Sequence, residues 1–130
     1  MSQEQEKNYL ENGEGFASWF FTVDHKRIGI MYLWAIGVFF IIAAIASFLV
    51  RFEHLTPGQT IMTAHTYNVL FTLHGSMMVF LFIVPGVAAS FGNFLIPLMI
   101  GAKDVIFPKL NLYSFWLYLF GAAVFMIALA

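Results

Sequence analysis

Charged residues along this chain are confined to short junctions between long apolar runs. No Asp, Glu, Lys or Arg occurs in residues 28–50, 54–102 or 110–130. A helix over residues 28–50 would be roughly 35 Å long at about 1.5 Å per residue, and the hydrocarbon core of a membrane is about 30 Å thick. The pattern therefore predicts an all-α membrane protein with three transmembrane helices, over residues 28–50, 68–98 and 113–130, the last of which we expect to be incomplete.

The second apolar run is longer than one membrane crossing requires. It contains Pro85 and Gly86 near its middle. Proline removes one helical hydrogen bond and its ring clashes with the preceding turn. We therefore predict a kink near Pro85.

Basic residues are distributed unevenly between the two ends of the predicted helices. Membrane proteins keep their lysines and arginines on the cytoplasmic side. With a cytoplasmic amino terminus only Arg51 lies outside, and five basic residues lie inside, namely Lys7, Lys26, Arg27, Lys103 and Lys109. This count predicts a cytoplasmic amino-terminal segment at 1–27, an outer loop at 51–67 and an inner loop at 99–112.

The composition supports the membrane assignment and limits the available metal chemistry. Hydrophobic residues make up 61% of the 130 residues, the formal net charge is −1, and cysteine is absent. A disulfide framework and thiolate metal sites are thus excluded, so a metal would need His, Met or oxygen ligands. We expect contact with membrane lipid and no nucleic-acid partner.

His74 is the one histidine that the pattern places deep inside a predicted span. Counting from Asn68 puts it roughly 9 Å along the second helix. An unsatisfied imidazole nitrogen at that depth would cost about 1 to 3 kcal/mol, so His74 needs a partner. The residues leave open whether that partner is a cofactor or a neighbouring helix, although Gly75 would let a flat macrocycle approach.

Arg51 ends the first span on the outer side, where His74 also lies. Its position alone favours an arginine that reaches the interface or pairs with Glu53. The functional alternative is a cation that contacts a cofactor held by His74. A fixed positive charge there would raise the reduction potential of that cofactor.

Asp104 is the only acid on the inner side after the first span, and Asn93 and Asn111 lie before and after it. The spacing returns both amides to one hairpin. A carboxylate with amides behind it can collect protons and order water. The alternative is a solvated loop acid beside Lys103 and Lys109, which spacing alone favours.

The order of these landmarks resembles the start of subunit I of the haem-copper terminal oxidases, particularly cytochrome c oxidase with a D-type proton pathway. The resemblance extends from about Trp19 to Trp116. It rests on blocks in the family's order and spacing, which are "DHKRIGIMYL", "RFE" followed by "PG", "YNVLFTLHG", "FGNFLIPLMIGAKDVIFPKLN" and "SFW".

This resemblance implies roles for residues at the outer end. His74 would be an axial ligand of the low-spin haem, haem a in this type, and Arg51 would lie at the haem formyl group. Tyr67 would lie near a haem propionate. Glu53 and Gly58 match positions of a calcium or sodium site in some members.

At the inner end, the resemblance makes Asp104 the entrance acid of the proton pathway, with Asn93 and Asn111 lining its first stretch. Leu112 stands where the family often has a second asparagine, which makes the polar lining thinner. Ala89 and Ser90 replace frequent glycines.

For the whole subunit the resemblance implies a bundle of about twelve helices that reduces oxygen to water and pumps protons in a bacterial-type inner membrane. The second histidine of the low-spin haem, the high-spin haem and the copper ligands would lie outside these 130 residues, so this segment alone is not catalytic. The expected partners are subunits of the II and III types, with cytochrome c as electron donor.

Two positions bear on the electron donor. The quinol-oxidising branch of the family carries an acid and a histidine where this chain has Leu55 and Thr66, so cytochrome c is favoured over quinol. His65 is one position off and would point about 100° away on a helix. The other readings left open are a nitric oxide reductase and a non-catalytic membrane protein.

Overall fold

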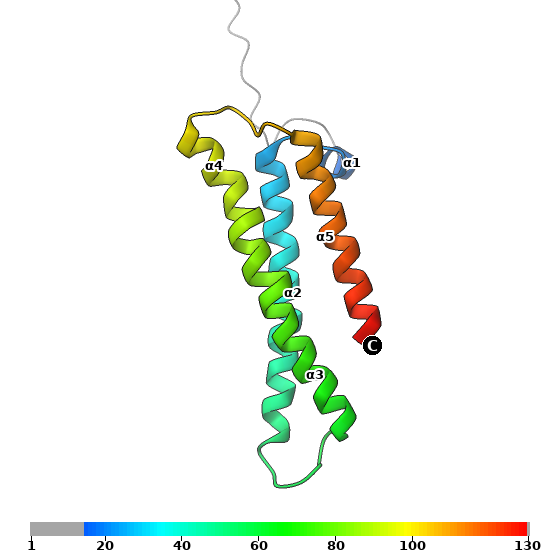
Figure 1. Cartoon of the computed structure of the whole chain (residues 1–130). Coiled ribbons are helices and arrows are strands. Elements are labelled where there is room, and N and C mark those ends of the chain that lie inside the picture. The colour runs from blue at the N-terminus through cyan, green and yellow to red at the C-terminus, as the bar shows by residue number, and fades with distance from the viewer. Residues whose placement is uncertain (1–14, 130) are drawn as a thin grey trace, which may run out of the picture.

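The computed structural model describes residues 15–129, and this part of the chain is helical without strands. Figure 1 shows a long central helix crossed by a second long helix, with a third helix beside them and a short helix at one end. The elements are α1 (Phe16–Phe20), α2 (His25–Glu53), α3 (Ala64–Ser76), η1 (Met77–Ile83), η2 (Gly86–Phe91), α4 (Gly92–Ile100) and α5 (Pro108–Leu129).

Three stretches of helix in the described residues are long and apolar enough to cross a membrane. They are α2, the continuous stretch Ala64–Ile100, and α5. The predicted class, an all-α membrane protein with three transmembrane helices, is confirmed. The predicted amino-terminal segment 1–27 lies only partly within the described residues, since positions 1–14 fall outside them.

The helix boundaries follow local capping chemistry. Asp24 caps α2, because its carboxylate accepts a hydrogen bond of 3.1 Å from the Lys26 amide. Thr63 caps α3 in the same way, through the Thr66 amide at 3.3 Å. Helix α5 begins at Pro108, ahead of the apolar run, because proline is well suited to a first helical turn.

The chain stays helical through Pro85, with π-helical turns on both sides of it. These wide turns are η1, which ends at Ile83, and η2, which begins at Gly86. Pro85 has no amide hydrogen, so the carbonyl of Leu81, four residues earlier, lacks its usual helical donor. The Tyr118 hydroxyl of α5 donates to that carbonyl at 2.6 Å. A neighbouring helix thus supplies the hydrogen bond that proline removes.

Replacing Tyr118 with phenylalanine tests this role of its hydroxyl. We expect Tyr118→Phe to lower the free energy of unfolding by about 1 kcal/mol, because the Leu81 carbonyl loses its donor inside the bundle. The measurement is the thermal midpoint of the purified membrane protein. Tyr113→Phe is the matched control, since Tyr113 is an exposed tyrosine on the same helix, and equal midpoints for the two variants would contradict the role.

Small residues let the helices approach closely, as is usual in membrane bundles. A Cβ at Gly29 of α2 would lie 2.8 Å from the Phe94 ring and 3.2 Å from the Asn93 Cβ, both on α4. Ala43 of α2 and Ala122 of α5 are buried in one cluster with Met77. Close packing at Gly29 brings the starts of α2 and α5 and the end of α4 to the same end of the molecule (Figure 1).

Candidate functional site

His74 contacts the backbone of α2 through one ring nitrogen. Its Nδ1 lies 2.9 Å from the carbonyl oxygen of Ala43. A carbonyl oxygen can only accept, so Nδ1 carries the hydrogen and donates. In the neutral imidazole the other nitrogen, Nε2, then holds a free lone pair. This is the tautomer in which histidine can bind a metal through Nε2, with its ring orientation fixed by the second nitrogen.

The space beside His74 suits a flat ligand. His74 is only half-buried, and Gly75 is exposed, with no atom within 4 Å of the place where a Cβ would lie. Met77, one turn further on, is fully buried against Ala43 and packs this part of α3 and η1 onto α2. His74 is thus held by a fixed backbone contact next to an open surface, which fits an axial ligand of a haem.

Arg51 lies nearer the carboxyl-terminal end of α2, here called the outer end after the predicted orientation, than the point where His74 touches it. That contact is at Ala43, eight residues or about 12 Å earlier along the helix and within a quarter turn around it. Arg51 is exposed. Within the described residues it forms no salt bridge with Glu53, which was the alternative expected from position. Its guanidinium is therefore available to contact a ligand that extends outward from His74.

Glu53 organises the outer connection between α2 and α3. Its Oε1 accepts a hydrogen bond of 2.8 Å from the Thr60 amide, and its Oε2 accepts bonds from Ile61 and Met62 at 3.0 and 3.1 Å. A cation at this carboxylate would compete with three amides. Gly58 has a φ of 94° and so supplies the turn of this loop. The calcium or sodium site at Glu53 and Gly58 stays a prediction.

Tyr67 faces the end of α2. Its hydroxyl lies 3.4 Å from Nε2 of His54, whose Nδ1 donates to the carbonyl of Val50 at 2.9 Å. Because His54 carries its hydrogen on Nδ1, the Tyr67 hydroxyl is the donor. This contact fixes Tyr67 on the same outer side as Arg51. The sequence analysis did not single out His54.

At the opposite end of the bundle, here called the inner end after the predicted orientation, Asp104 pairs with a histidine. Its Oδ1 lies 2.8 Å from Nδ1 of His25, the first residue of α2. His25 is buried, with 5% of its surface exposed, whereas the Asp104 side chain is 47% exposed. The solvent-exposed carboxylate of Asp104 is therefore in direct contact with a buried imidazole. Its partner is His25, not the neighbouring Lys103 or Lys109.

Asn93 and Asn111 return to one hairpin, as the spacing predicts, and their side chains form a hydrogen bond. The Asn111 Nδ2 donates to the Asn93 Oδ1, and the Asn93 Nδ2 donates to the Ala89 carbonyl. Asn93 is buried and packs beside Gly29, which lies one turn after His25 along α2. The pair of amides thus lies one helical turn inward from the contact between His25 and Asp104.

Further hydroxyl groups continue this polar arrangement between α2 and α5. The Tyr32 hydroxyl lies 2.9 Å from Oγ of Ser114, which donates to the Asn111 carbonyl at 2.7 Å. Tyr32 is buried against Phe115, with ring centroids 5.0 Å apart. The sequence analysis assigned no role to Tyr32 or Ser114, because a single tyrosine or serine in an apolar helix offers no signal by itself. The arrangement extends from the surface acid into the bundle.

These features define a class of protein. A multi-pass membrane bundle holds a histidine in a metal-binding tautomer near one end and a polar row of carboxylate, imidazole, amide and hydroxyl groups at the other. Ionisable and polar residues inside a membrane bundle commonly mark ligand sites or proton pathways. The model of the family described as cytochrome c and quinol oxidase polypeptide I matches residues 27–130, and the chain belongs to this family.

Individual relatives agree with the family model. A probable cytochrome c oxidase subunit 1-alpha of Streptomyces avermitilis is 43% identical over 112 residues, which is 86% of this chain and 19% of the relative. Cytochrome c oxidase subunit 1 of Thermostichus vulcanus is 44% identical over 97 residues, which is 75% and 18%. The protein of that name from Alkalihalophilus pseudofirmus is 39% identical over 120 residues, which is 92% and 18%. The chain thus spans about a fifth of the length of these relatives.

Proposed function

We propose that this chain contributes to subunit I of a respiratory terminal oxidase, which reduces oxygen to water and pumps protons. The observation that carries the proposal is the contact between Nδ1 of His74 and the Ala43 carbonyl, since it leaves Nε2 able to bind haem iron. The names of the relatives and the matching family support the activity.

His74 would hold the low-spin haem, with Arg51 and Tyr67 toward the outer end. When bound, the haem accepts and passes on one electron at a time. The Ala43 carbonyl keeps the imidazole in one orientation. The positive charge of Arg51 would favour the reduced state of the cofactor, and the Tyr67 hydroxyl would give the outer edge a hydrogen-bonding group. We infer haem a for this site, with the high-spin haem and copper bound elsewhere in the subunit.

Asp104 would take up protons at the inner surface. Its carboxylate is open to solvent and bonds to His25, so a proton that reaches Asp104 has an imidazole within hydrogen-bond distance. The amides of Asn93 and Asn111 follow one helical turn further in. Amides do not titrate, so their role would be to orient water molecules that carry the proton inward.

We propose cytochrome c as the electron donor and subunits of the II and III types as partners, in a bacterial-type inner membrane with the amino terminus cytoplasmic. Leu55 and Thr66 support cytochrome c, because neither side chain can carry the charge that an acid or a histidine would supply. A quinol oxidase is the alternative that the family name itself includes.

An assay of the purified oxidase that contains this subunit tests the donor and the reaction together. We expect oxygen uptake with reduced cytochrome c to be at least about tenfold faster than with a quinol, a difference of about 1.4 kcal/mol in the barrier. Faster oxygen uptake with quinol would show that quinol, and not cytochrome c, is the electron donor. Reduction of nitric oxide without oxygen uptake would contradict the proposed reaction.

A further inference from the structure

The helical stretch Ala64–Ile100 carries residues of both candidate sites, and wide π-helical turns lie between them. His74 lies three residues before η1, and Asn93 lies two residues after η2. Such turns inside an α-helix are frequent at functional sites. Here they occupy most of the chain between the residue proposed to bind haem and an amide proposed to line the proton pathway.

Both of these residues contact α2. Nδ1 of His74 donates to the Ala43 carbonyl at 2.9 Å. The Asn93 Cβ lies 3.2 Å from the place where a Cβ of Gly29 would be. Ala43 and Gly29 lie fourteen positions apart, which places them within about 40° on one face of α2.

The rotation between His74 and Asn93 depends on the wide turns. In an uninterrupted α-helix, side chains nineteen positions apart, as these two are, would point about 100° apart. In the structure both meet the same helix. A π-helical turn contains more residues than an α-helical turn, so it changes the rotation per residue. The wide turns therefore set how the two side chains face α2.

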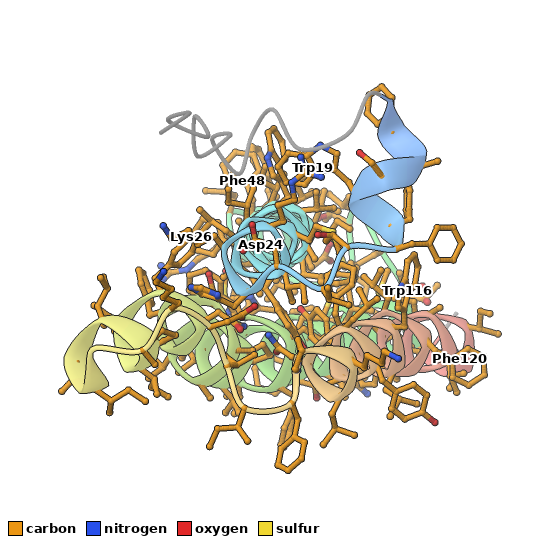
Figure 2. All side chains as sticks on the ribbon, turned by 90° about the horizontal axis from the view of Figure 1, so that it is seen from above. Trp19, Asp24, Lys26, Phe48, Trp116 and Phe120 are labelled. Atoms are coloured by element: carbon orange, nitrogen blue, oxygen red, sulfur yellow. The ribbon has the colours of Figure 1, made fainter. Side chains whose placement is uncertain are left out.

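A hydrogen bond from α5 acts on this stretch. The Tyr118 hydroxyl donates to the Leu81 carbonyl in η1 at 2.6 Å. Leu81 is buried and lies four residues before Pro85, which has no amide hydrogen to donate. Figure 2 looks down on the end at which α2 and α5 begin and shows α4 and α5 on the same side of α2. This arrangement lets a side chain of α5 reach the wide turns.

The ring of Tyr118 is packed against α2. Its centroid lies 5.5 Å from that of Tyr32 and 5.9 Å from that of Phe39. Tyr118 packs against both hydrophobic clusters of the bundle, which are Ala43, Met77, Leu81 and Ala122 on one side and Ile28, Tyr32 and Phe115 on the other. The ring is thus held against α2 while the hydroxyl holds η1, so Tyr118 fixes the position of η1 relative to α2.

We propose that Tyr118 is a positioning residue, which sets the orientation of His74 and Asn93 relative to α2 through the Leu81 carbonyl. The inference rests on the proposed function for the roles of His74 and Asn93. Without the hydroxyl, the wide turns lose a donor that holds them to α5. The rotation between the two halves of the stretch would then change, although the helices themselves would persist.

Electron paramagnetic resonance of the intact oxidised oxidase tests the effect on His74. Contacts of the second ring nitrogen orient an axial imidazole, and the g-values of a ferric low-spin haem depend on that orientation. We expect Tyr118→Phe to shift the largest g-value of the low-spin haem at parent haem content. Tyr113→Phe, the exposed control on α5, should give the parent spectrum.

Identical g-values in the parent and both variants would overturn the inference. A parent oxidase without a low-spin haem signal would contradict the proposed function instead, so the two failures are distinguishable.

A Pro85→Ala background tests whether Tyr118 acts through the Leu81 carbonyl. Alanine at position 85 returns an amide that can donate to this carbonyl. We expect Tyr118→Phe to shift the g-value less in this background than in the parent, because two donors to one acceptor are not independent. Equal shifts in the two backgrounds would mean that the hydroxyl acts elsewhere, and the inference would be wrong.

A cryo-electron microscopy map of the Tyr118→Phe oxidase gives a readout that does not depend on the haem spectrum. We expect the transmembrane helices to be retained, with η1 and η2 rotated relative to α2 and the Asn93 side chain displaced from Asn111. A map in which the wide turns and the bond between Asn93 and Asn111 match those of the parent would contradict a positioning role.

Discussion

His74→Ala in the full subunit should abolish the absorption band of the low-spin haem. His74 is the histidine that α2 holds with its Nδ1 on a backbone carbonyl, so that Nε2 is directed to a ligand. Alanine cannot bind iron, and no other described histidine lies near Ala43. We therefore expect complete loss of the band in the reduced-minus-oxidised spectrum of the purified oxidase, together with loss of electron transfer to oxygen.

His65→Ala is the matched control for this result. His65 lies in the first turn of α3 and is exposed, so its removal should leave the band in place. An unchanged low-spin band in His74→Ala would contradict the ligand assignment. In that case the contact with Ala43 would be only a hydrogen bond between two helices.

Asp104→Asn should slow proton uptake from the inner side and leave haem content unchanged. Asparagine has nearly the same shape as aspartate and can still accept from His25 and from the Val105 amide, which bonds to Asp104 at 2.8 Å. It cannot take up a proton. We expect turnover to fall by at least about tenfold, equal to about 1.4 kcal/mol in the barrier. The measurement is pH-indicator uptake during turnover of the oxidase in vesicles.

Asp24→Asn separates this effect from a general loss of negative charge at the inner end. Asp24 caps α2, and asparagine is an equally good capping residue, so the helix should be preserved. Its Oδ1 lies 3.8 Å from Nδ1 of His25, beyond hydrogen-bond distance, so the substitution leaves the 2.8 Å contact between His25 and Asp104 in place. We expect near-parent turnover for this control. If Asp104→Asn also turned over and took up protons at the parent rate, Asp104 would be a loop charge without a role in proton entry.

The helices could be predicted from the sequence because their signal is continuous. Long runs without charge leave only helices or closed barrels as spanning structures, and the runs are too long for barrel strands. The response to Pro85 could not be predicted. It depends on Tyr118, which lies 33 positions later and reaches the Leu81 carbonyl only because α5 packs beside η1. A sequence pattern within one helix contains no information on that contact.

Individual candidate residues could likewise be chosen from the sequence, whereas their partners could not. Depth alone singled out His74, but its tautomer follows from the contact with the Ala43 carbonyl. Every residue has a backbone carbonyl, so no sequence motif identifies this one as the partner. Similarly, spacing predicted that Asn93 and Asn111 return to one hairpin, but the hydrogen bond between their side chains could not be predicted. The pairing of Asp104 with His25 joins residues 79 positions apart, and it arises from the close approach of α2 and α4 at Gly29.

The measurement that tests the central claim most directly is a structure of the complete oxidase with its cofactors bound. We expect Nε2 of His74 bonded to the iron of the low-spin haem while Nδ1 still donates to the Ala43 carbonyl. A low-spin haem held by two other histidines, with His74 bonded only to α2, would contradict the account.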